Sequence, residues 1–200
     1  MRSRFLNAIF LLAIYAISTR ASAHIGVHDI AQTGFWTGFV HPLTGLDHLA
    51  AMVTVGLWSA LAARRAGPEL LWGPMGFASL LLVGAVMGLQ GVALPAVEPM
   101  IAASLLLLGL LVVTRRRMPG VTAAALVGAF AIFHGVAHST ELAEAGNAWQ
   151  TLAGMLAATF LLHATGLGLG WALRSANAWL PRVVGTAVAV FGSALLLQLT

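Results

Sequence analysis

The apolar residues of this chain gather in six long stretches that are separated by short polar segments. Each stretch approaches the roughly 20 residues that an α-helix needs to cross the hydrocarbon core of a bilayer. A backbone exposed to lipid must form its hydrogen bonds internally, so all six stretches are predicted to be helices. Turn residues such as Gly67-Pro68 and Pro119-Gly120 separate them. The predicted helices cover residues 41–63, 71–89, 95–114, 121–138, 149–173 and 181–199.

A shorter apolar stretch, residues 5–17, precedes these six at the N-terminus. Arginines at positions 2 and 4 come before it, and Ala21-Ser22-Ala23 follows it. A basic start, a short apolar core and small residues at a cleavage position are typical of a secretory signal peptide. The alternative is an uncleaved first helix. We expect a signal peptide over residues 1–23 and a mature chain, residues 24–200, that forms a single domain of six transmembrane helices.

Composition agrees with an all-α, polytopic membrane helix bundle. The chain is 60% hydrophobic and 8% charged, whereas soluble domains average about 25% charged residues, so an ordinary soluble domain is excluded. The formal net charge is +4, but the arginines lie at the ends of apolar stretches, which indicates membrane topology and gives no reason to expect a nucleic-acid partner. The chain contains no cysteine, which excludes disulfides and thiolate metal sites.

The arginines also predict how the bundle is oriented. If the mature N-terminus lies outside the cytoplasm, every arginine of the mature chain falls on the cytoplasmic side, as the positive-inside rule requires. These residues are Arg64, Arg65, Arg115, Arg116, Arg117, Arg174 and Arg182. The expected location is therefore the inner (cytoplasmic) membrane of a bacterium, with the mature N-terminus in the periplasm.

The segment HPLTGLDH at the start of the first predicted helix carries His41, Asp47 and His48. Ionisable groups inside a membrane segment are costly and usually functional. Pro42 suits the first turn of a helix, which would place His41 at the entrance. On a regular helix the two histidines would lie about 10 Å apart along the axis, too far to share an ion unless the segment bends near Gly45. Asp47 is predicted either to bind the ion or to orient a histidine of a neighbouring helix.

The segment FHGVAHSTE, residues 133–141, carries a second group. His134 and His138 are four residues apart, so they share one helical face, and Glu141 follows three residues later. In the predicted topology both segments lie at a similar depth near the outer surface. Imidazole and carboxylate ligands suit nickel, cobalt, zinc or iron, so we expect one metal site built from both segments. The alternative is that these groups only hydrogen-bond to each other.

Other ionisable residues are candidates for metal capture or exit. Cleavage after Ala23 would expose an α-amino group beside His24, with His28 and Asp29 close behind. Such a group can capture a divalent cation, or it is a polar tail that happens to contain histidine. His163, deep in the fifth predicted helix, is an exit ligand, a proton acceptor, or a histidine hydrogen-bonded to a neighbour.

The segments HPLTGLDHLAAMVTVGLW and FHGVAHSTE resemble those of the HupE/UreJ family, membrane proteins associated with nickel supply to hydrogenases and ureases. The resemblance covers the whole mature chain. It implies a nickel permease in which His41, Asp47 and His48 are required for uptake and His138 and Glu141 contribute. Ser139 is a departure, because the family pattern usually has glycine there.

We therefore expect a transporter, not an enzyme, that moves Ni(II) as its substrate and carries no prosthetic group. Cobalt, zinc and copper remain open as substrates, and hydrogenase or urease maturation proteins are the expected recipients of the ion. No P-loop is visible, so ATP is not expected to drive transport. One alternative is an intramembrane metal-dependent hydrolase acting on a lipid-like amide or ester, for which Ser139 and Asp47 are available. A haem b protein with two histidine ligands is another.

Overall fold

The computed structural model describes residues 34–199 except 145, 176 and 178, and it describes the backbone but not the side chains of residues 140, 141 and 144. The predicted signal peptide and the capture residues His24, His28 and Asp29 lie outside the described residues. Within the described part every regular element is helical. The elements are α2 (Phe35–Thr44), α3 (Leu46–Ala62), the 3₁₀ turn η1 (Pro68–Leu70), α4 (Trp72–Leu89), α5 (Val97–Thr114), α6 (Gly120–Ala137), α7 (Ser139–Glu144), α8 (Ala148–Leu173) and α9 (Trp179–Gln198).

Five of these helices, α4, α5, α6, α8 and α9, are long and apolar enough to cross a membrane. The pair α2 and α3 adds a sixth if it is counted as one broken span. The protein is therefore an all-α polytopic membrane bundle, as the six apolar stretches predict. The bounds of the last five predicted helices agree with the structure to within two residues at each end.

The first predicted helix, residues 41–63, is wrong in its start and its continuity. The structure begins a helix at Phe35 and breaks it at Gly45, where α2 and α3 meet at 84°. Pro42 consequently lies inside α2, not in a first turn. The ten residues of α2 span only about 15 Å, too short to cross a bilayer. Packing against α8 holds α2 in place: a Cβ at Gly38 would collide with the carbonyl oxygen of Thr151.

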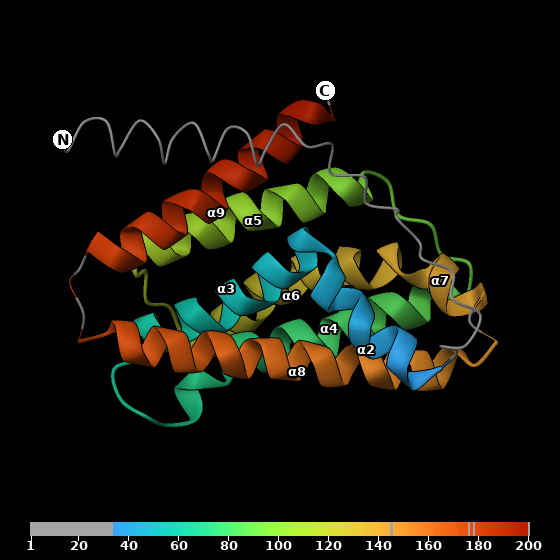
Figure 1. Ribbon diagram of the computed structural model, residues 1–200, viewed down its shortest axis with the longest axis horizontal. Helices are drawn as coiled ribbons and strands as arrows, with labels where there is room; N and C mark the ends of the chain where they lie inside the picture. The colour runs from blue at the N-terminus through green and yellow to red at the C-terminus, as the bar shows by residue number, and fades with distance from the viewer. Residues whose placement is uncertain (1–33, 145, 176, 178, 200) are drawn as a thin grey trace.

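The helices pack in closely spaced pairs, which Figure 1 shows as neighbouring ribbons: α4 with α6, α3 with α8, and α5 with α9. Small residues let the backbones of the paired helices come this close. A Cβ at Gly84 would collide with the carbonyl oxygen of Ile132, and one at Gly166 with that of Val53. Because lipid tails are as apolar as the helix surfaces, the hydrophobic effect does not drive helices together in a membrane. Van der Waals contact between the backbones stabilises these pairs instead. Gly84 and Gly88, like Gly166 and Gly170, lie four residues apart, a spacing of small residues that is typical of closely packed membrane helices.

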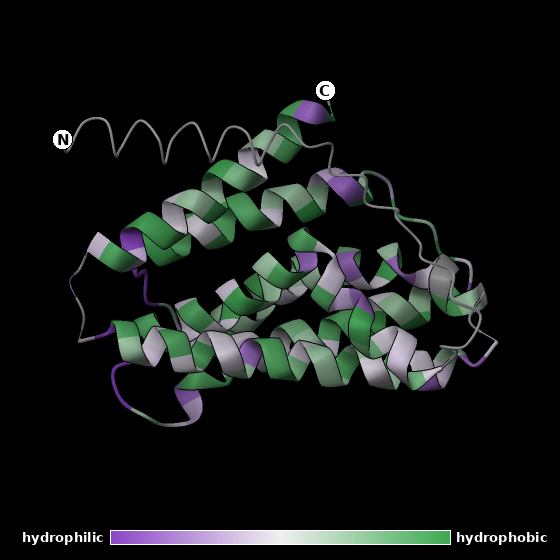
Figure 2. Cartoon of the chain, viewed as in Figure 1, coloured by the Kyte–Doolittle hydropathy of each residue, from purple (hydrophilic) through white to green (hydrophobic). Residues whose placement is uncertain are grey.

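The polar residues concentrate at the ends of the bundle, as the colours of Figure 2 show. The connections α3–α4, α5–α6 and α8–α9 carry the arginines and lie together on the left in Figure 1; we call this the arginine end. Arg174 ties two of them together, because its Nη2 donates to the carbonyl oxygens of Ala63, at 2.6 Å, and Arg64, at 3.1 Å. The opposite end holds α2 and α7.

An acidic residue organises the α3–α4 connection at the arginine end. Glu69 Oε1 accepts hydrogen bonds from the backbone N–H groups of Arg64 and Arg65, each at 3.0 Å. The N–H of Arg65, followed by that of Arg64 and the charges of both guanidinium groups, lowers the pKa of the Glu69 carboxyl below its usual value. Glu69 is therefore ionised at neutral pH and fixes the turn that leads into α4.

Candidate functional site

Four histidine rings meet at the end of the bundle opposite the arginines. The ring centroid of His138 lies 4.5 Å from that of His41 and 4.4 Å from that of His48. The centroid of His48 lies 4.9 Å from that of His134 and 6.2 Å from that of His41. We call these four residues the histidine cluster. Its members come from α2, α3, α6 and the turn after α6, so both predicted segments contribute.

The break at Gly45 brings His41 into contact with the cluster. Gly45 has extended backbone angles, φ −80° and ψ 111°, and serves as the C-cap of α2 and the N-cap of α3. The change of direction folds the last turn of α2 back toward α6. The bend that a shared site requires is therefore present. A side chain at Gly45 would press on the neighbouring Asp47 carboxylate, whose Oδ1 lies 3.2 Å from where a Cβ would stand.

Asp47 orients His48. Its Oδ1 lies 2.9 Å from both the backbone N and the ring Nδ1 of His48. The ring therefore donates its Nδ1–H to the carboxylate and keeps a lone pair on Nε2, which is buried without a hydrogen-bond partner in the structure. The expectation that Asp47 orients a histidine of another helix is corrected: in the first turn of α3 its side chain satisfies the next residue along the chain. A carboxylate on the far nitrogen is the arrangement found behind metal-bound imidazoles.

A hydrogen bond to one ring nitrogen also orients His134, which is fully buried. Ser104 Oγ donates its single O–H to the carbonyl oxygen of Ile101 at 2.6 Å and lies 3.1 Å from His134 Nε2. Because the serine proton is already used, His134 donates its Nε2–H to Ser104 and keeps a lone pair on Nδ1. That nitrogen is also buried, with no hydrogen-bond partner among the described residues. Ser104 is not among the residues predicted from the sequence, although a serine within an apolar helix is a signal that could have found it.

The cluster offers nitrogen donors without forming a closed chelate. Among the described residues, no group of three histidine, aspartate or glutamate side chains is arranged so that it could hold one metal ion. His48 and His134 instead present one buried lone pair each from adjacent rings. The side chain of Glu141, the remaining predicted ligand, lies outside the described residues.

His163 lies apart from the cluster, deeper in the bundle and 1% exposed. The ring of Phe77 contacts the ring of His163, and the two ring centroids lie 5.3 Å apart.

Glu98, in the first turn of α5, is exposed.

Comparison with known proteins identifies the family. A family model described as HupE / UreJ protein matches residues 12–195. The chain belongs to the HupE/UreJ family. It is 43% identical over 188 residues to Protein HupE of Rhizobium leguminosarum bv. viciae, and the match covers 92% of this chain and 94% of that protein. No solved structure matches the chain. The family expected from the two histidine segments is therefore confirmed.

Proposed function

We propose that this HupE/UreJ protein is a permease that carries Ni(II) across the inner membrane into the cytoplasm. The observation that supports this most strongly is the pair of buried lone pairs on His48 Nε2 and His134 Nδ1, each fixed by a hydrogen bond on the other ring nitrogen. Leaving a buried polar atom unpaired costs about 1–3 kcal/mol. Two such atoms on touching rings are explained if a cation binds between them.

The incomplete coordination sphere favours transport over a resident metal. A permeation site must bind its ion well enough to remove part of the hydration shell, yet weakly enough to release it. Nitrogens of His48, His134, His41 and His138 can bind the ion successively while water completes its coordination, and the sequence adds Glu141, whose side chain lies outside the described residues, as a further candidate ligand. The same donor chemistry would serve cobalt or zinc, and the absence of cysteine disfavours a soft Cu(I) site.

The positions of the arginines support inward transport. Every arginine of the described residues lies in a connection at the arginine end or at the adjoining end of a helix. With that end in the cytoplasm, the histidine cluster lies toward the periplasm, and the candidate capture residues His24, His28 and Asp29, which are outside the described residues, precede it in the sequence. A doubly charged ion moving inward gains about 4–5 kcal/mol per 100 mV of membrane potential, which is enough to drive uptake. Maturation of hydrogenase or urease consumes the nickel.

The test is uptake of radiolabelled nickel by sealed proteoliposomes that hold the purified protein under an inside-negative potential. We expect saturable uptake that collapses with the potential, is lost in His48→Ala, and is retained in Phe160→Ala, a variant on the exposed side of α8. Cobalt, zinc and copper supplied in competition measure selectivity. Uptake equal to that of protein-free liposomes would refute the proposal.

A further inference from the structure

His163 is buried in α8 with neither ring nitrogen hydrogen-bonded in the structure. One nitrogen must carry a proton and the other a lone pair, so both groups are unsatisfied. Burying each of them without a partner costs free energy. An apolar side chain of similar size would avoid this cost, so packing alone gives no reason for a histidine at this position.

Phe77 connects this residue to the histidine cluster. Its side chain is 1% exposed, and its ring centroid lies 5.4 Å from that of His134 and 5.3 Å from that of His163. One aromatic ring therefore touches the innermost member of the cluster on one side and the buried histidine on the other. The spacing on either side is close to the spacing between rings within the cluster.

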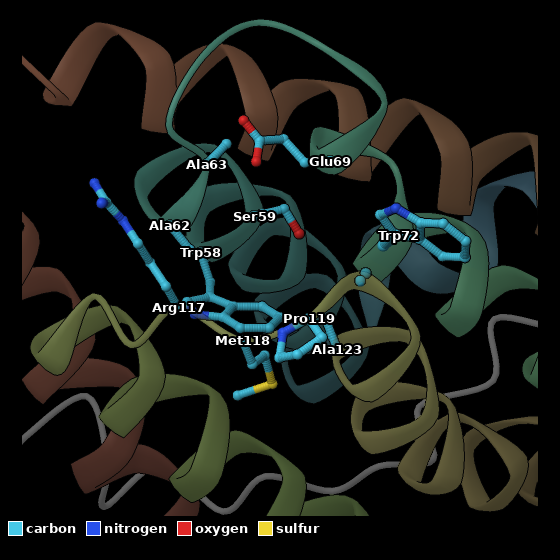
Figure 3. A pocket seen from close by; sticks show the side chains of 12 residues that line it. Trp58, Ser59, Ala62, Ala63, Glu69, Trp72, Arg117, Met118, Pro119 and Ala123 are labelled. Carbon is cyan, nitrogen blue, oxygen red and sulfur yellow. The ribbon is translucent and has the colours of Figure 1, made fainter.

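The arginine end of the bundle contains a pocket. Its volume is about 210 Å³, and it is lined by residues that include Trp58, Ser59, Glu69 and Met118. Figure 3 shows Ser59 among these side chains, and its Oγ is buried with no hydrogen-bond partner in the part of the chain that the structure describes.

Two helix contacts place the pocket one turn from His163 and Phe77. A Cβ at Gly56 would collide with the backbone carbonyl of His163, and Ser59 follows Gly56 by three residues on α3. A Cβ at Gly73 would meet Ser59 Oγ, and Phe77 follows Gly73 by four residues on α4. Phe77 and His163 therefore stand between the histidine cluster and the pocket.

We propose that His163 is a second, inner station for the transported ion, and that the ring of Phe77 is the barrier between this station and the histidine cluster. The pocket around Ser59 is then the exit to the cytoplasm. This inference rests on the proposed permease function and adds to it a second binding site and a gate. An apolar ring in a narrow pathway blocks a hydrated ion, and rotation of the ring about its side-chain bonds opens the way.

The inner station is tested by His163→Leu. Because leucine removes two unsatisfied polar atoms, we expect the thermal stability of the detergent-purified protein to be unchanged or higher. The maximal rate of nickel uptake should nevertheless fall by about tenfold or more, the effect typical of losing a metal-site residue. The half-saturating nickel concentration should stay unchanged, because the histidine cluster is intact. If the leucine variant does not fold, His163→Gln replaces it with the same readouts. Uptake at the wild-type rate in the folded variant would overturn the inner station.

The barrier is tested through a single introduced thiol, because the natural chain has no cysteine. In right-side-out membrane vesicles, Ser59→Cys should react slowly with silver ions added outside. Adding Phe77→Ala should speed this reaction by about tenfold or more, the change that a barrier lower by about 1.4 kcal/mol produces. Phe160→Ala, the same substitution at an exposed position, should leave the rate unchanged. Equal rates in the Phe77 and Phe160 variants would overturn the barrier.

The two proposals can fail separately. Wild-type protein that moves no nickel refutes the permease, and the inner station falls with it. Wild-type protein that moves nickel, combined with His163 and Phe77 variants that behave as wild type in both assays, refutes only the inner station and its gate.

Discussion

Replacing Asp47 by asparagine isolates the part that the carboxylate takes in holding the ion. Oδ1 accepts from both the backbone N and the ring Nδ1 of His48, each at 2.9 Å. Asparagine keeps the shape and one accepting oxygen but loses the charge that fixes the ring tautomer and makes Nε2 a stronger donor to metal. Loss of a carboxylate behind a metal-binding histidine typically costs about 10–100-fold in affinity. That range corresponds to about 1.4–2.7 kcal/mol of binding free energy.

The assay is the nickel dependence of uptake in proteoliposomes, supported by titration calorimetry on the purified protein. We expect the half-saturating nickel concentration of Asp47→Asn to rise by about 10–100-fold, while the melting temperature stays at the wild-type value. Because Asp47 acts through His48, the effects of Asp47→Asn and His48→Ala on binding should not add in the double variant. Wild-type half-saturation, or fully additive losses, would refute this account of the pair.

Three further results are expected from other parts of the structure. Gly38→Ala should destabilise the protein by about 1–3 kcal/mol because its Cβ collides with the backbone of α8, whereas Gly168→Ala, with nothing within 4 Å of its Cβ position, should leave the melting temperature unchanged. Ser104→Ala should leave the Nε2–H of His134 buried and unpaired, so thermal denaturation should show a loss of about 1–3 kcal/mol and nickel affinity should fall. The lowered pKa of Glu69 means that its support of the α3–α4 connection is present above its usual value of 4.5 and is lost as pH falls through the lowered pKa. Protection against amide hydrogen exchange in that connection, measured relative to the intrinsic exchange rate at each pH, should therefore fall on acidification, and Glu69→Gln should remove this change in protection.

The helices of the bundle could be predicted because the bilayer imposes their length and their internal hydrogen bonding. The last five begin and end where apolar stretches meet Gly, Pro or Arg, and the structure agrees closely. The gathering of the arginines at one end of the bundle could also be predicted, because the sequence itself shows which ends of the apolar stretches carry charge. The pairing of helices through glycines was visible as a spacing, although which helix faces which was not.

The start of the first helix and its break at Gly45 could not be predicted, because both depend on tertiary contacts. Periodicity cannot distinguish one helix from two that meet at 84°, and the start at Phe35 depends on the fit of Gly38 against α8. The candidate ligands could be selected as costly polar groups in apolar segments. The residues that support them are harder to predict: Ser104 is a polar residue in an apolar helix, but its pairing with His134 depends on tertiary contact, and nothing in the sequence distinguishes Phe77 from other apolar residues.

For the proposed permease function, the central requirement is that the histidine cluster holds the transported ion. The most direct measurement is anomalous X-ray scattering at the nickel absorption edge from crystals of the nickel-loaded protein. We expect a peak beside His48 Nε2 and His134 Nδ1 that is absent when both residues are replaced by alanine. Nickel density confined to the surface of the protein, or a peak within the bundle that survives the double replacement, would contradict it.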